Sequence, residues 1–151
     1  MACVTKLSAP AFGMKFYYNV SAKVGPYASR GCINNPTDVE LVNLLMSIDT
    51  TPWPGKMTPG IIRRGSTFDV STGFLIYGVQ DSADDQFTKS ASPDGCVSVG
   101  NATGQYGSST LYTIIALNNN ARSANPKAWL KLFNEPGISP ALKTQITHPY
   151  T

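Results

Sequence analysis

The sequence predicts a mainly α-helical domain with a small β element near its N-terminus and two extra helices at its C-terminal end. Three observations support this fold class. Helix starts of the form Asn-Pro or Ser-Pro recur at residues 35–36, 125–126 and 139–140, and proline at the first helical position loses no hydrogen bond. Apolar residues follow these starts at helical spacing. The period of two that is typical of a strand is clear only over residues 12–20.

The predicted strand runs from Phe12 to Val20, where apolar residues alternate with Gly13, Lys15, Tyr17 and Asn19. One face is wholly apolar, and the aromatic residues favour a strand further. A single strand needs a partner. We expect residues 96–99, or the stretch around Ile61 and Ile62, to supply it.

The first helix is predicted from Pro36 to Ile48. Asn35 can accept hydrogen bonds from the first amide groups, and Asp38 places a negative charge at the positive end of the helix dipole. Glu40 is predicted to face solvent. The remaining residues form an apolar face too broad for a surface helix, so this helix is expected at the centre of the core.

Four further helices follow in the prediction. The second starts at Asp69 or Ser71 and continues to Gln80, although Gly73 and Gly78 weaken it. The third runs from Ser108 or Ser109 to about Leu117, where the three asparagines 118–120 are expected to end it. The last two cover residues 125–133 and 139–147; the polar, glycine-rich stretch over residues 81–107 precedes the third helix. The first three helices are expected to pack as a bundle, with the β element beside them.

Length and composition indicate one domain over residues 1–151. A chain of 151 residues can bury a single core. Charged residues make up only 14%, well below the usual quarter, so the surface is expected to be neutral and polar. Such a surface suits uncharged polymers such as glycans better than nucleic acid, because the net charge is only +3 and the only adjacent basic pair is Arg63-Arg64.

No apolar run approaches the length of a membrane span, so no membrane association is expected. The N-terminus does not resemble a signal peptide, because Lys6, Pro10 and Gly13 interrupt it. We therefore expect synthesis in the cytoplasm, with any delivery to the periplasm or cell wall by a route without a cleaved signal. The three cysteines are read as buried or unreactive thiols; a Cys32–Cys96 disulfide in an oxidising compartment is left open.

The sequence offers no familiar catalytic or metal constellation. His148 is the single histidine, and three residues from the end it is expected to be frayed and solvated. Zinc sites and Cys–His or Ser–His–Asp catalysis need more than this. A glycosidase needs only two carboxylates, but Asp38 and Asp69 are explained as helix-start residues and Asp94 as a turn residue. We therefore expect no enzyme activity, no metal and no cofactor.

Three segments in order resemble the peptidoglycan-binding-like modules. The first is Val24-Gly25, then Asn34-Asn35-Pro36 and Asp38-Val39 with Val42, Leu44 and Leu45. The second is residues 68–73 with Leu75-Ile76 and Val79-Gln80. The third is Asp94-Gly95 with Val97 and Gly100, then residues 109–111 and 115–118. Asn43 stands where the family pattern usually has glutamine, and the insertion at residues 100–107 is longer than the pattern usually allows.

The resemblance implies a three-helix core over residues 24–120, with residues 121–151 as a helical extension. It also implies a noncatalytic module that binds peptidoglycan, through its glycan or its stem peptide. Similar modules occur in phage lysis proteins and in bacterial secretion-system effectors. The alternatives are an interaction or assembly protein of a phage or secretion system on the same fold and, third, a small cell-wall hydrolase or toxin.

Binding of a glycan or peptide favours aromatic faces beside neutral hydrogen-bonding groups. Loop residues are the expected source, because loops lie at the surface. The candidate ligand-binding residues are Tyr27, Arg30, Asn34, Trp53, Gln105 and Tyr106. Tyr77 and Tyr112 fall within helical apolar patterns and are assigned to the core. A protein partner is expected to contact Trp129 and Phe133.

Overall fold

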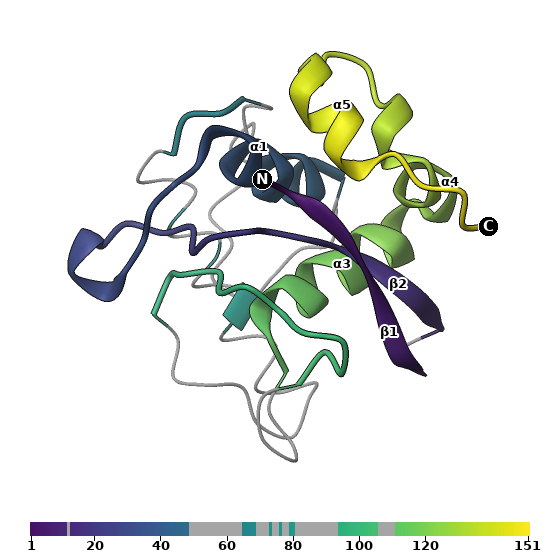
Figure 1. The fold of residues 1–151 in the computed structure, drawn as a ribbon, viewed down its shortest axis with the longest axis horizontal. Helices are drawn as coiled ribbons and strands as arrows, with labels where there is room; N and C mark the ends of the chain where they lie inside the picture. Colours follow the sequence, from purple (N-terminus) through teal and green to yellow (C-terminus); the bar gives the residue numbers. More distant parts are fainter. Residues whose placement is uncertain are drawn as a thin grey trace.

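The computed structural model describes residues 1–11, 13–48, 65–68, 73, 76, 79–80, 94–105 and 111–151. Their elements in chain order are β1 (Cys3–Ala11), β2 (Met14–Asn19), the 3-10 helix η1 (Ala28–Arg30), α1 (Pro36–Ile48), α3 (Thr113–Ala124), α4 (Pro126–Leu130), the 3-10 helix η2 (Leu132–Asn134) and α5 (Pro140–Ile146). Figure 1 shows the β1–β2 hairpin crossing α3, with α4 and α5 grouped near the C-terminus.

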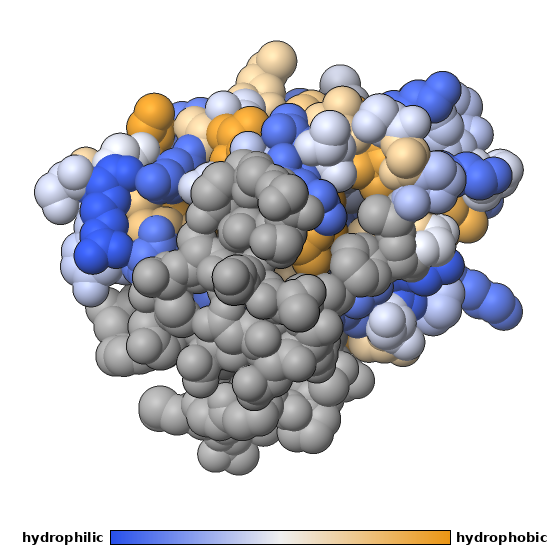
Figure 2. All heavy atoms as spheres, turned by 90° about the horizontal axis from the view of Figure 1, so that it is seen from below, coloured by the Kyte–Doolittle hydropathy of each residue, from blue (hydrophilic) through white to orange (hydrophobic). Residues whose placement is uncertain are grey.

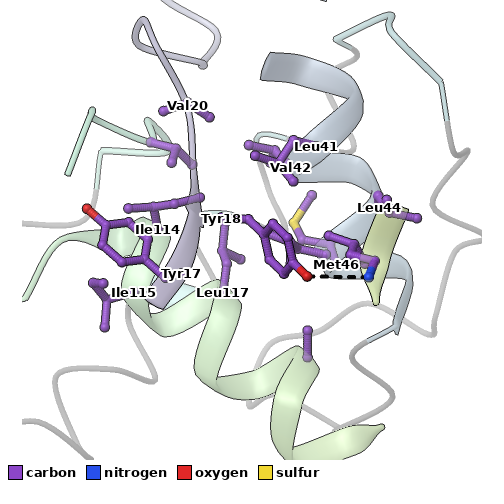
Figure 3. Packing of buried hydrophobic residues seen from close by; sticks show 14 of the residues in the cluster. Tyr17, Tyr18, Val20, Leu41, Val42, Leu44, Met46, Ile114, Ile115 and Leu117 are labelled. Carbon is purple, nitrogen blue, oxygen red and sulfur yellow. Dashed lines mark hydrogen bonds between the residues drawn. The ribbon is translucent and has the colours of Figure 1, made fainter. Parts of the chain in front are cut away.

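The predicted three-helix core is wrong for this chain. The described residues are 44% helical and 17% strand, and they form four α-helices and a two-stranded antiparallel sheet. α3 packs against α1, α4 and β2. Tyr17 and Tyr18 of β2 are both fully buried and point to opposite sides of the strand (Figure 3), Tyr17 towards Ile114 and Ile115. The hairpin is thus part of the core rather than an element beside it.

The strand that pairs with β2 is β1, not residues 96–99. The two strands are antiparallel, with Cys3 opposite Asn19 and an irregularity between Lys6 and Ala11. They are joined by a turn in which Gly13 has a φ of +75°, a conformation that glycine adopts readily. The sequence of β1 contains polar residues and a proline, so it lacks the alternating pattern that predicts a strand. An edge strand tolerates such residues, because it does not need a continuous apolar face. Of the expected partners, Val97 pairs with Val24 instead, and residues 61–62 lie outside the described residues.

Helix α1 confirms the predicted bounds and the predicted central position. It begins at Pro36, ends at Ile48 and buries nearly every residue between Asp38 and Met46. Asp38 is itself fully buried. Its carboxylate accepts hydrogen bonds from the Ser21 amide and hydroxyl, both at 2.9 Å, and from the Ala22 amide at 3.1 Å. It therefore holds the chain that leaves β2 against the start of the helix.

Glu40 does not face solvent as predicted. Only 5% of its surface is exposed, and its carboxylate accepts hydrogen bonds from the Ser139 amide at 2.7 Å and the Ser139 hydroxyl at 2.5 Å. Ser139 also accepts from the Leu142 amide as the N-terminal cap of α5. A negative charge at this end of α5 is favourable, because the first amides of a helix lack partners. Glu40 thus fastens the C-terminal part of the chain to α1.

The asparagine run does not end α3 as predicted, because it lies inside the helix. Asn118 is fully buried, and its side-chain oxygen accepts from the Tyr18 amide at 2.9 Å and the Trp129 indole at 3.0 Å. Its side-chain nitrogen donates to the carbonyl oxygens of Tyr18 and Ile114, both at 2.8 Å. These four bonds use the full capacity of the amide. The predicted start at residues 108–109 lies outside the described residues.

The second predicted helix is described only at Gly73, Ile76, Val79 and Gln80, all of which are helical. The starts of the two C-terminal helices are confirmed, with Asn125 and Ser139 as side-chain caps and proline at the first turn. α4 ends at Leu130 and η2 continues to Asn134. None of the helices formed by the described residues is long and apolar enough to span a bilayer.

Trp129 and His148 belong to a buried aromatic cluster, so both predictions for their exposure are wrong. Trp129 is 3% exposed and stacks on Phe16, with ring centroids 5.0 Å apart. His148 is 9% exposed, and its Nε2 lies 2.9 Å from the Tyr18 hydroxyl. The Trp129 ring is therefore not available to a partner. Phe133 is half-buried and meets the edge of the His148 ring.

Removal of the Asn118 side-chain amide is expected to destabilise the whole fold. In Asn118→Ala, the Tyr18 amide and the Trp129 indole lose their acceptor in the core, so the free energy of unfolding should fall by about 3 kcal/mol or more. Urea denaturation measures the loss. Asn119→Ala, at the partly exposed next position of the same helix, is the control and should change stability by less than about 1 kcal/mol. Equal effects of the two substitutions would contradict the assigned role.

Stability is expected to fall on acidification through His148. Burial lowers the pKa of His148, and its Nδ1 accepts a hydrogen bond from the Tyr150 amide at 3.1 Å, which requires the neutral ring. His148 therefore binds a proton more tightly in the unfolded chain than in the folded protein. Its contribution to the free energy of unfolding is fully present above the unfolded pKa of about 6.5 and is lost as the pH falls below that value. Urea midpoints between pH 8 and pH 5 should show this decrease in the wild type and a weaker one in His148→Gln. Identical slopes would exclude His148 as the cause.

Candidate ligand-binding site

The side chain of Gln80 organises one side of the candidate site. Its oxygen accepts hydrogen bonds from the amides of Asp94 at 3.0 Å and Gly95 at 2.9 Å. Its nitrogen donates to the Asp94 carboxylate, the Cys96 carbonyl and the Thr113 hydroxyl, at 2.9–3.0 Å. One buried amide thus joins the helical residue Gln80, the turn at residues 94–96 and the start of α3. A buried hydrogen-bond network of this kind stabilises the fold most when each of its donors and acceptors has a partner.

The turn at Asp94 and Gly95 is shaped by local constraints as well. The Asp94 carboxylate accepts from the Cys96 amide at 2.9 Å, the side-chain-to-backbone bond that favours aspartate in turns. Gly95 has a φ of +73°, which residues with a side chain adopt at a cost. These contacts confirm the assignment of Asp94 as a turn residue and hold its carboxylate at the surface of the site.

The loop over residues 24–34 is fixed against this turn. Val24 and Val97 exchange two backbone hydrogen bonds of 3.0 and 2.7 Å. Asn34 donates to the Gly25 carbonyl and accepts from the Gly25 amide, both at 2.9 Å. Asn34 is also in the left-handed region, with a φ of 56°, which asparagine tolerates better than most residues. Its amide is committed to the loop backbone.

A pocket of about 270 Å³ opens beside these elements. It combines neutral hydrogen-bonding groups, one carboxylate and the partly exposed ring of Tyr112, and is more polar than most small-ligand sites. In the face shown in Figure 2, hydrophilic residues dominate the described part and apolar residues form small, separate groups. The described residues that line the pocket are Gln80, Asp94, Cys96, Ser98, Leu111, Tyr112 and Thr113.

Arg30 is the last residue of the 3-10 turn η1, and Tyr27 precedes that turn. Neither is among the residues that line the pocket, but Arg30 lies near Asp94, which is one of them. The Arg30 guanidinium is 5.2 Å from the centre of the Tyr27 ring, and one of its nitrogens lies 4.0 Å from Asp94 Oδ2. Tyr27 is 50% exposed and the Arg30 side chain 53% exposed. An ion pair this exposed stabilises the fold by less than about 1 kcal/mol. Both side chains are therefore free to turn towards a ligand at little cost.

The six predicted binding residues have different outcomes. Tyr27 and Arg30 lie together, with Arg30 near the lining residue Asp94, whereas the Asn34 side chain is hydrogen-bonded to the backbone of Gly25. Gln105 is exposed, and its backbone pairs with Leu111, a lining residue. Trp53 and Tyr106 lie outside the described residues, as does Tyr77 among the aromatic residues assigned to the core.

Sequence reasoning missed most of the pocket lining. Val79-Gln80 and Asp94-Gly95 both belong to the motifs of the resemblance. Because a long polar connection separates them, the sequence does not indicate that the Gln80 amide bonds to the turn. Tyr112 was assigned to the core because it fits a helical apolar pattern, yet it precedes α3 and is only partly buried. The usable signal was an amide side chain at a helix end followed by an Asp-Gly turn.

Comparison with known proteins gives no match: no family model fits the sequence, and no curated protein or solved structure is significantly similar to the chain. The function must therefore be argued from the pocket and its surroundings.

The turn at residues 94–96 is expected to loosen when the Gln80 amide is lost. Hydrogen exchange of the Asp94 and Gly95 amides should accelerate about fivefold or more in Gln80→Ala, because one buried hydrogen bond contributes about 1 kcal/mol. Gln80→Glu keeps the size and the acceptors but places a carboxylate 3.0 Å from Asp94, and should be as disruptive. Gln105→Ala, at an exposed glutamine, is the control. Unchanged exchange in both Gln80 variants would contradict this account.

Proposed function

We propose that the chain is a noncatalytic module that binds peptidoglycan at the pocket beside Asp94, with Tyr27 and Arg30 at its rim. The observation that carries the proposal is the ordered pocket itself. Its walls offer the hydroxyl groups of Ser98 and Thr113, the Asp94 carboxylate and the ring of Tyr112. These groups are suited to the neutral acetamido and hydroxyl groups of a glycan strand and to the short stem peptide attached to it.

The charges around the pocket support a stem peptide as part of the ligand. Arg30 carries five donors in a planar fork that matches a carboxylate, and its present contact with Asp94 is long and exposed. Asp94 can accept from an ammonium group. The exposed face of Tyr27 can stack on a sugar ring or an aliphatic side chain. A stem peptide with a free carboxylate and a free ammonium group, attached to a sugar ring, would use all three groups.

The interaction or assembly alternative receives less support. It depended on Trp129 and Phe133 as contact residues. Trp129 is buried and its indole donates to Asn118, which leaves only the half-buried Phe133. The pocket, in contrast, is concave and contains convergent polar groups. Binding of a small polar ligand is therefore the function that we favour.

Cosedimentation with purified sacculi tests the proposal. The wild-type chain should sediment with sacculi, and Tyr27→Ala and Arg30→Ala should each weaken binding about tenfold, the loss expected for about 1.4 kcal/mol. Lys143→Ala removes an exposed cation from α5 and should bind as the wild type does. Folding of each variant is checked by its urea midpoint.

Two binding results would overturn the proposal, and one activity result would overturn its noncatalytic part. One is a wild-type chain that stays in the supernatant with intact sacculi. The other is equal binding by the wild type and both rim variants. Release of soluble muropeptides from labelled sacculi would show that the protein is catalytic, and would exclude the noncatalytic role directly.

A further inference from the structure

Two cysteines that are 64 positions apart in the sequence face each other in the fold. The Cys32 and Cys96 sulfur atoms lie 3.3 Å apart and are not bonded to each other in this structure. A disulfide has a sulfur–sulfur distance of about 2.05 Å, so closure requires a movement of about 1.3 Å. Cys96 is buried and Cys32 is half-buried, which leaves one of the two sulfurs open to a reagent.

The backbone around both cysteines holds the sulfurs in this position. Val24 and Val97 are paired by two hydrogen bonds next to the cysteines, and the Cys96 amide is bound by Asp94. Gly25 lies between the two thiols: a Cβ atom there would come within 2.7 Å of the Cys96 sulfur and 2.8 Å of the Cys32 sulfur. The absence of a side chain at residue 25 is therefore what allows the sulfurs to approach each other.

We propose that Cys32 and Cys96 are the site of an oxidative cross-link that ties the loop over residues 24–34 to the turn at residues 94–96. The oxidant is a disulfide of low molecular mass or of a thiol oxidoreductase. The two cysteine thiols lose two protons and two electrons, and one sulfur–sulfur bond forms between them. The disulfide of the oxidant accepts the electrons and is released as two thiols, so the exchange balances.

The order of the two steps follows from exposure. Burial, reinforced by the neighbouring Cys32 thiol and the Asp94 carboxylate, raises the pKa of Cys96 to about 12. The half-buried Cys32 therefore attacks the oxidant first and forms a mixed disulfide, releasing one thiol. Cys96 then loses its proton and attacks the Cys32 sulfur, which expels the second thiol. Because the thiolate is the nucleophile, the second step should become faster as the pH rises.

The cross-link bears on the proposed pocket as well. Cys96 is one of its lining residues, and Cys32 follows the turn that carries Tyr27 and Arg30. A disulfide between them joins the loop that carries residues 27–30 to the turn at residues 94–96. In an oxidising compartment this would fix the spacing between the two parts, and it would also constrain the unfolded chain by closing a long loop. The inference concerns the thiols alone and does not depend on which ligand the pocket takes.

Thiol counting on the folded, full-length chain tests this site. The reduced protein is equilibrated with excess oxidised glutathione, alkylated, and analysed by intact mass and by peptide mapping. We expect loss of two hydrogen atoms, alkylation of Cys3 alone, and one peptide pair joined through Cys32 and Cys96. Cys3→Ser should behave in the same way. Cys32→Ser and Cys96→Ser should give no internal link.

The urea midpoint provides a second readout, which oxidation at an unrelated thiol would not raise. The urea midpoint of the oxidised wild type should lie above that of the reduced protein, and a thiol reductant should abolish the difference. The matched comparison is Cys32→Ser, in which the reductant should have no effect on the midpoint. Three alkylatable thiols after equilibration, a link that involves Cys3, or an oxidised protein no more stable than the reduced one would each overturn the proposal.

Discussion

The fold depends on the buried amide of Asn118. Its four hydrogen bonds join the backbone of β2, the preceding turn of α3 and the indole of Trp129. Tyr18 occupies an interior position of β2, where its amide and carbonyl face the helix rather than β1. A strand packed edge-on against a helix leaves backbone groups without a ladder partner, and each such group is costly to bury. Asn118 supplies both partners from a single side chain.

The same solution recurs at other joints of the molecule. Asp38 holds the chain after β2, and Glu40 holds the cap of α5. The hydrogen bonds described for both carboxylates come from amide and hydroxyl groups. An ionised carboxylate that accepts two or more such bonds is stabilised without a countercharge. This arrangement is consistent with a chain in which only 14% of residues are charged, because two of its few carboxylates are used as internal connectors.

Local signals predicted α1 and the starts of α4 and α5 well, because caps and prolines act over a few residues. The failures all involve contacts between distant segments. The asparagine run was expected to end a helix, and His148 to be frayed, because local rules do not register the partners that these side chains find in the fold. Those partners are Trp129 for Asn118 and Tyr18 for His148. For the site, loop position identified Tyr27 and Arg30. Loop position could not show that the Asn34 side chain is hydrogen-bonded to the Gly25 backbone, nor that the Gln80 amide fixes the turn beside the pocket.

The two sides of the candidate site differ in how firmly they are held. The wall is continuous with the core: Gln80 bonds to Thr113 at the start of α3, the helix that carries Asn118. The rim is a single 3-10 turn with no buried residue. The loop that carries it is bound to the wall by the Val24–Val97 backbone pair, but its Arg30 side chain is held only by an exposed ion pair that contributes little. A ligand would thus meet a preorganised surface on one side and an adjustable one on the other. Preorganisation lowers the ordering cost of binding, so the affinity of this site should depend chiefly on how closely residues 27–30 are kept to the turn at Asp94.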